Sequence, residues 1–170
     1  MKPAKVPYNQ LLDNIGHTIE AARQHAFVAV NKQLVKANWE IGRHLVEFEQ
    51  QGKERAEYGS GLLARLSKDL TIRYGKGFGR RNVLDMRRFY LAFPKWQTVS
   101  AKLSWSHHIA LLSVSDAAAR KFYEKQAVLE NWSKRELERQ IDSSLFERLA
   151  LSRNKKDVLQ LAQKGHVVKQ

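Results

Sequence analysis

The sequence predicts an all-α fold, in which a long N-terminal helix precedes a helix-turn-helix-like helical bundle. Apolar residues recur every three or four positions through most of the 170 residues, which is the spacing of an amphipathic helix. The alternation of β-branched residues that is typical of strands is nearly absent. Only three prolines occur, and two of them lie in the first seven residues, so little interrupts a helical chain. We expect one helical domain over residues 8–150.

The first predicted helix covers Tyr8 to Gln51 and stops at Gly52. Its apolar positions are Leu12, Ile15, Ile19, Ala22, Ala26, Val30, Leu34, Ala37, Ile41, Leu45 and Phe48. A helix of this length would measure about 65 Å, which exceeds the diameter of a domain of this size. It must therefore bend or break, with Gly16 and Gly42 as candidate positions, or pair with another chain as a coiled coil. A homodimer and a long helix that folds over its own domain are both open alternatives.

The next two predicted helices form a helix-turn-helix-like unit over residues 60–93. Ser60 is placed to cap a helix that ends near Tyr74, with Leu63, Leu66 and Leu70 along one side. A turn over Gly75–Gly79 follows, and a helix over Arg80–Phe93 ends before Pro94. Val83, Met86, Tyr90 and Phe93 share one face of this second helix. In a helix-turn-helix protein the second helix enters the major groove of DNA.

The remaining sequence predicts a second helical unit over residues 105–145. A short helix over 105–112 precedes a longer one that Ser115 or Asp116 caps and that runs to Leu129. Ser133 and Glu136 then have the spacing of a capping box, and Trp132 and Leu137 that of a hydrophobic staple. Ile141 and Leu145 continue the apolar stripe of this helix. Residues 151–170 are predicted to be a basic tail or a linker to a C-terminal domain that is missing from this chain.

Charge is concentrated in the middle of the chain. The whole sequence has 30 Lys and Arg against 17 Asp and Glu, a formal net charge of +13. Residues 58–105 hold 10 basic and 2 acidic side chains, against 8 and 7 in residues 1–57 and 12 and 8 in residues 106–170. Such a segment favours a polyanionic partner, and nucleic acid is the leading candidate. The alternative is a basic surface that serves solubility alone.

The predicted DNA contacts lie mainly in and around the basic helix, because arginine binds both phosphates and guanine edges. A second basic cluster follows Trp132, where two cations stand in the first turn of a helix against the helix dipole. The predicted nucleic-acid-binding residues are Arg73, Lys76, Arg80, Arg81, Asn82, Arg87, Arg88, Lys134, Arg135 and Arg139.

Other functional classes are excluded or disfavoured. Without cysteine the chain has no disulfide, no thiolate zinc site, no cysteine nucleophile and no iron–sulfur cluster. The pair His107 and His108, and Glu40 with His44, lack the third ligand that a metal site needs. No Asp or Glu stands two residues before a Lys, as a PD-(D/E)xK nuclease would require. We expect no catalysis by this chain, no cofactor and no metal.

The chain is also predicted to stay away from membranes. No apolar run approaches the ~18 residues of a membrane span. Residues 1–7 lack the apolar stretch of a secretion signal, and the absence of cysteine fits a reducing compartment. We therefore expect a cytoplasmic location.

Several segments together resemble one known family. They are VNKQLVKANWEIGR at 30–43, YGSGLLARLSKDL at 58–70, GKGFGRRNVLDMRRFY at 75–90, LSWSHH at 103–108 and WSKRELERQI at 132–141. The chain is similar, over about residues 8–165, to the N-terminal region of the YhcG-type family, a domain of unknown function. In full-length members this region precedes a PD-(D/E)xK nuclease domain. The resemblance implies a DNA-targeting module of a bacterial nuclease, whose catalysis belongs to a domain outside this chain.

Two functional hypotheses follow from the residues and the resemblance. The first is a DNA-binding or targeting module, with DNA and a nuclease domain, in the same or an associated chain, as partners. The second is an oligomerisation or protein-docking module that uses the long N-terminal helix.

Overall fold

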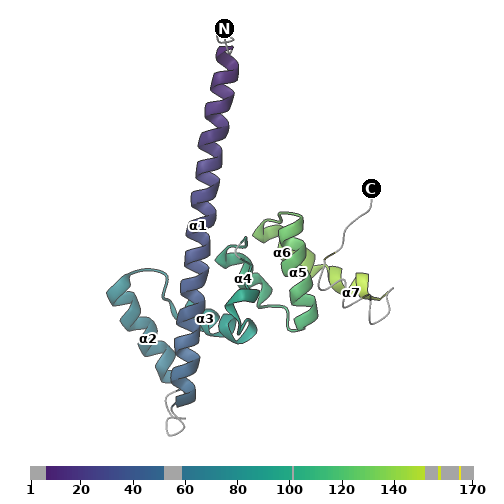
Figure 1. Ribbon diagram of the computed structural model, residues 1–170. Helices are drawn as coiled ribbons and strands as arrows, with labels where there is room; N and C mark the ends of the chain where they lie inside the picture. Colours follow the sequence, from purple (N-terminus) through teal and green to yellow (C-terminus); the bar gives the residue numbers. More distant parts are fainter. Residues whose placement is uncertain (1–6, 52–58, 101, 152–156, 158–164, 166–170) are drawn as a thin grey trace.

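A computed structural model describes residues 7–51, 59–100 and 102–151, together with the single residues 157 and 165 (Figure 1). These parts of the chain are helical and contain no strand, which confirms the all-α prediction. Along the chain the helices are α1 (Tyr8–Gln51), α2 (Gly59–Tyr74), α3 (Arg80–Ala92), the short 3₁₀ helix η2 (Trp96–Thr98), α4 (Trp105–Leu111), α5 (Ala117–Leu129), α6 (Lys134–Asp142) and α7 (Leu145–Ala150).

Helix α1 is unbroken over 44 residues, with the bounds that its apolar spacing predicts. The expected break or bend at Gly16 or Gly42 does not occur. Gly42 is buried against α3 instead, where its missing side chain lets the two helices approach closely. Only the C-terminal half of α1 lies among the other helices, and its N-terminal half projects beyond them (Figure 1). The excess length of this helix is therefore not folded over the domain.

Helices α2 and α3 are joined by the predicted glycine turn. Gly75 and Gly77 have φ angles of +85° and +113°, which favour glycine over any residue with a side chain. The hydroxyl of Ser67 donates to the carbonyl of Phe78 at 2.7 Å and fastens the turn to α2. The prediction that Ser60 caps this helix is wrong, because α2 begins at Gly59 and so includes Ser60. Helix α3 ends at Ala92, one residue before the predicted end.

The first of two apolar cores joins α1, α3 and α4. Val35 and Phe89 are fully buried there, with Trp39, Phe93, Val99 and Leu112 around them. The indole N–H of Trp39 donates to the carbonyl of Phe93 at 2.7 Å, so α1 also holds the C-terminal end of α3. This core fixes α3 against α1.

The second core is enclosed by α4, α5, α6 and α7. Asp116 caps α5 by accepting from the N–H groups of Ala118 and Ala119, as one of the two predicted caps. Ser133 caps α6 by accepting from the N–H of Glu136 at 3.2 Å. The apolar stripe that predicted one helix through Leu145 is divided, because Ser144 has a left-handed φ of +52° and begins a new helix.

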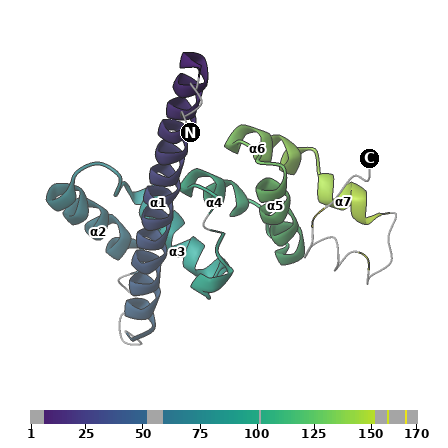
Figure 2. The same cartoon turned by 45° about the horizontal axis from the view of Figure 1, so that its top comes forward.

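The two cores lie on different parts of the fold. Figure 2 shows α2 on one side of α1 and the α5–α7 group on the other, as does Figure 1. Among the described helices none has the length and hydropathy needed to cross a bilayer. The predicted tail over 151–170 lies outside the described residues, apart from residues 151, 157 and 165.

Candidate nucleic-acid interface

Helix α3 has one buried face and one exposed face. Val83, Met86 and Phe89 turn inward and are at most 2% exposed. On the other side Arg80, Arg81, Leu84, Arg88 and Leu91 are exposed. We call these five residues the α3 basic face. Because α1 and α4 hold the opposite side, this face is presented on a rigid support.

The first turn of α3 carries two unpaired cations. Arg80 and Arg81 are exposed, and within the described residues neither makes a hydrogen bond or an ion pair. No acidic residue stands in this turn, and the cap, Gly79, has no side chain. Cations are disfavoured at a helix N-terminus by a few tenths of a kcal/mol up to about 1 kcal/mol. An incoming anion would remove this penalty.

Two further predicted contacts lie beside this turn. Arg73 is in the last turn of α2 and Lys76 is in the glycine turn, and both are exposed. Neither has a partner among the described residues. Four cations from α2, the turn and α3 therefore lie along one short stretch of chain, at the junction of the two helices.

Arg87 and Arg88 are engaged with carboxylates. The Nε of Arg87 donates to both carboxylate oxygens of Glu49, at 2.8 and 3.0 Å, and so ties α3 to the end of α1. Arg88 pairs with Asp85 at 3.4 Å, but half of its side chain stays exposed. A second nitrogen of Arg88 donates to the carbonyl of Leu112 at 3.4 Å, so Arg88 ties α3 to the end of α4, and Arg87 ties α3 to α1.

Asn82 has its side-chain amide committed inside the protein. Its NH₂ group donates to the carbonyl of Gly77, and its oxygen accepts from the indole N–H of Trp105 at 2.9 Å. The residue thereby joins the glycine turn, α3 and α4. A contact from Asn82 to a base would have to break these bonds.

The second predicted cluster lies on α6. Lys134 pairs with Glu138 at 2.6 Å, and Arg139 pairs with Glu136 at 2.7 Å. The hydrogen bond from Arg139 lowers the pKa of the Glu136 carboxyl and raises that of the guanidinium. Arg135 is exposed and has no partner among the described residues. Helix α6 packs on α4, whereas α2 lies on the other side of α1 (Figures 1 and 2).

Most of the aromatic residues around α3, α4 and α6 pack into the two cores. Phe89 is fully buried, and its ring meets those of Trp105 and His108 at centroid distances of 5.2 and 4.9 Å. Trp39 is 8% exposed and packs on Tyr90. Trp132 packs against the second core beside Leu137, as the predicted staple requires. Tyr74, in the last turn of α2, is by contrast 67% exposed.

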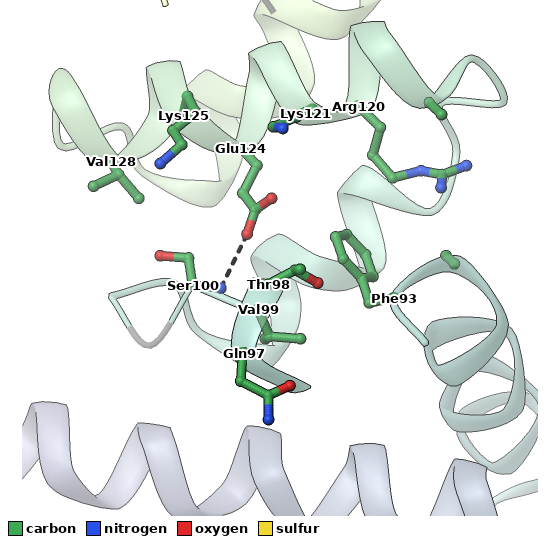
Figure 3. Close-up of a pocket in the computed structure, with 12 residues that line it drawn as sticks. Phe93, Gln97, Thr98, Val99, Ser100, Arg120, Lys121, Glu124, Lys125 and Val128 are labelled. Carbon is green, nitrogen blue, oxygen red and sulfur yellow. Dashed lines mark hydrogen bonds between the residues drawn. The ribbon is translucent and has the colours of Figure 1, made fainter. Parts of the chain in front are cut away.

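A pocket of about 530 Å³ that sequence reasoning missed lies between residues 97–100 and α5 (Figure 3). Its buried carboxylate, Glu124, accepts from the backbone N–H of Ser100 at 3.0 Å. Burial raises the pKa of Glu124, although Lys121 and Lys125 act in the opposite direction. Arg120 turns its guanidinium to the carbonyl of Val114. The sequence does show three cations within six residues of α5, which could have pointed to this pocket. The hydrogen bond from Ser100 to Glu124 could not be foreseen, because it depends on tertiary structure.

The exposed face of α3 lies within a region that has known relatives. The family described as the DUF1016 N-terminal domain matches residues 14–148. The chain belongs to this family. In Escherichia coli (strain K12), the protein named Putative nuclease YhcG is 40% identical over 185 aligned positions, which cover 90% of this chain and 49% of that protein. The resemblance to the YhcG-type family is thus confirmed.

The coverage of the two proteins is unequal. The chain spans about half the length of the curated relative that it matches. No solved structure gives a significant match.

Proposed function

We propose that this domain binds duplex DNA through the α3 basic face and brings an associated nuclease to its target. The observation that carries the proposal is the pair Arg80 and Arg81. Both are exposed, have no partner among the described residues, and lie at the N-terminal end of a helix whose other face is fixed in the core. Arg73, Lys76 and Arg88 extend the positive charge around it. The name of the E. coli relative, Putative nuclease YhcG, supports nucleic acid as the polyanion.

Helix α3 would enter the major groove in the manner of a helix-turn-helix protein. One open face on a helix supported from behind is what that mode of docking requires. A-form RNA has a deep and narrow major groove that a helix does not enter, so duplex DNA is favoured over duplex RNA. Leu84 and Leu91, which lie among the arginines, are available for apolar contact with thymine methyl groups.

The test is fluorescence anisotropy with labelled duplex DNA, single-stranded DNA and duplex RNA over a series of salt concentrations. The variant is Arg80→Gln with Arg81→Gln, and its matched control is Lys121→Gln with Lys125→Gln, two exposed cations on α5. Each pair removes two charges. If both arginines contact phosphates, their loss makes the slope of log affinity against log salt concentration shallower by about 1.8 per chain.

We expect the arginine variant to bind duplex DNA more weakly with this shallower slope, while the lysine control keeps the parent slope. Equal slopes for the two variants would mean that net charge alone attracts DNA, and would overturn the assignment of the interface to α3. Charge reversal by Arg135→Glu tests the second basic cluster, on α6, in the same assay.

A protein-docking role is the second candidate function. The observation that favours it is the exposed apolar surface on the N-terminal half of α1, which a DNA-binding role does not explain.

A further inference from the structure

The N-terminal half of α1 bears a stripe of apolar side chains in contact with solvent. Residues 8–30 are exposed apart from Gly16, which is intermediate. Leu12, Ile15, Ile19 and Val30 are each between 45% and 58% exposed. Together with Ala26 we call them the α1 stripe. Contiguous apolar surface of this kind marks an interaction site.

The α1 stripe runs directly into an apolar groove. Each residue of a helix turns by about 100°, so Ile19, Val30 and Ile41, spaced by eleven residues, lie within about 40° of one another. Ile41 lines a groove of about 360 Å³ between α1 and α2, and the other lining residues are His44, Leu45, Phe48, Leu62, Leu66 and Leu70. Val35, Trp39 and Val46, which are buried, occupy the opposite side of α1. Stripe and groove are therefore one continuous surface.

The apolar pattern of α1 is nearly the same when it is read backwards. When the helix is reversed about Val30, residue n takes the place of residue 60 − n. Nine of the eleven apolar positions of α1 then coincide with one another, and the exceptions are Ala22 and Ala37, which fall on Asn38 and Arg23. The matched positions are Leu12 with Phe48, Ile15 with Leu45, Ile19 with Ile41, Ala26 with Leu34, and Val30 with itself. An interface with two-fold symmetry has this property, because residue i contacts j and j contacts i.

We propose that two copies of this chain pair through antiparallel α1 helices centred on Val30, with the N-terminal half of each lying in the α1–α2 groove of the other. The N-terminal half of α1 is exposed on all sides, so no other part of the described chain stands between it and a second copy. The same register sets Phe27, which is 62% exposed, beside Leu34 of the second copy, which is 56% exposed. Leu62, Leu66 and Leu70 of α2 complete the contact.

The surface available matches what a stable dimer needs. The exposed halves of these side chains and the groove supply on the order of 600 Å² of apolar area per copy, so the pair would bury at least about 1,200 Å², at the lower limit for specific interfaces. A parallel pair would instead place the two α1–α2 grooves opposite each other, and each groove is already bordered by its own α2. Neither groove would then receive the exposed N-terminal half of α1 from the other copy.

The first experiment measures mass in solution by sedimentation over a range of protein concentrations. We expect a dimer for the parent chain, and a monomer with unchanged helicity for Ile19→Glu with Val30→Glu, because both side chains are exposed within one copy. Val28→Glu is the matched control. Val28 is 38% exposed and lies about 160° around the helix from Val30, so this variant is expected to remain a dimer.

Single cysteines test the register, and the natural chain contains none to interfere. In the antiparallel pair Val30→Cys lies opposite itself and is expected to form a disulfide dimer under mild oxidation. Ile19→Cys lies opposite residue 41 and is expected not to, whereas Ile19→Cys combined with Ile41→Cys cross-links. In a parallel pair Ile19→Cys alone would cross-link.

A parent chain that stays monomeric over the whole concentration range would overturn the proposal and leave the α1 stripe to a different protein. Efficient cross-linking of Ile19→Cys to itself would overturn the antiparallel register. Loss of the dimer in Val28→Glu as well would mean that the dimer contact is elsewhere on α1.

Discussion

Gly42 of α1 lies directly against the backbone of Met86 in α3. A Cβ at position 42 would overlap the carbonyl oxygen of Met86 and would come within 3.1 Å of the Cβ of Tyr90. Backbone cannot move aside as a flexible side chain can. The crossing of α1 and α3 therefore depends on glycine at this position, and with it the placement of the α3 basic face.

Substitution of Gly42 by Ala is expected to lower the free energy of unfolding by about 2 kcal/mol, because overpacking forces the two helices apart. Chemical denaturation followed by circular dichroism measures this. Gly16→Ala in the same helix is the control, since nothing lies within 4 Å of a Cβ at that position. It is expected to stabilise the protein by up to about 1 kcal/mol through helix propensity. Equal effects of the two substitutions would contradict the role of Gly42.

Asn82 is expected to matter for folding rather than for base recognition. Asn82→Ala would leave the indole N–H of Trp105 and the carbonyl of Gly77 without their partner. We expect a loss of about 1–3 kcal/mol in the free energy of unfolding. When DNA binding is measured well below the melting temperature of this variant, the slope of log affinity against log salt concentration should equal that of the parent protein. Asn14→Ala, at an exposed position on α1, is the control and should change stability by less than about 0.5 kcal/mol.

Several helix boundaries were predictable from local signals, although the cap expected at Ser60 was not among them. The cap at Asp116, the cap at Ser133 and the glycine turn each act within a few residues, and the structure places all three as expected. The roles of Arg87 and Asn82 were not predictable, because their partners Glu49 and Trp105 lie 38 and 23 residues away. The sequence alone presents Gly42 as a candidate break in α1, because only the packed structure shows that it faces the backbone of Met86.

Ser100 connects two buried titratable groups. Its N–H donates to Glu124, and its carbonyl is 3.3 Å from the Nε2 of His108. His108 is fully buried, and its Nδ1 has no hydrogen-bond partner in the described part of the chain. Burial lowers the pKa of His108 from 6.5 to about 4. The two residues are therefore expected to shift stability with pH in opposite directions.

The contribution of His108 is a loss of stability in acid. The pKa of His108 is lower in the folded state than in the unfolded chain. Its contribution to the free energy of unfolding is therefore fully present above pH 6.5 and is lost as the pH falls towards 4. The full effect is about 3 kcal/mol. His108→Leu should be less stable than the parent at pH 7.5, through loss of the bond to Ser100, and should lose that disadvantage by pH 4. His17→Gln, at an exposed position, should follow the parent at every pH.

The contribution of Glu124 has the opposite sign. Burial raises the pKa of Glu124 in the folded state above the unfolded value of 4.5. The stabilising contribution of this residue is therefore fully present below pH 4.5 and is lost as the pH rises through the folded pKa. Glu124→Gln keeps an oxygen for the N–H of Ser100 but cannot ionise. We expect this variant to match the parent in denaturant unfolding at pH 4 and to be the more stable protein at pH 8. A difference that stays constant over this range would show that the buried carboxyl does not titrate on folding.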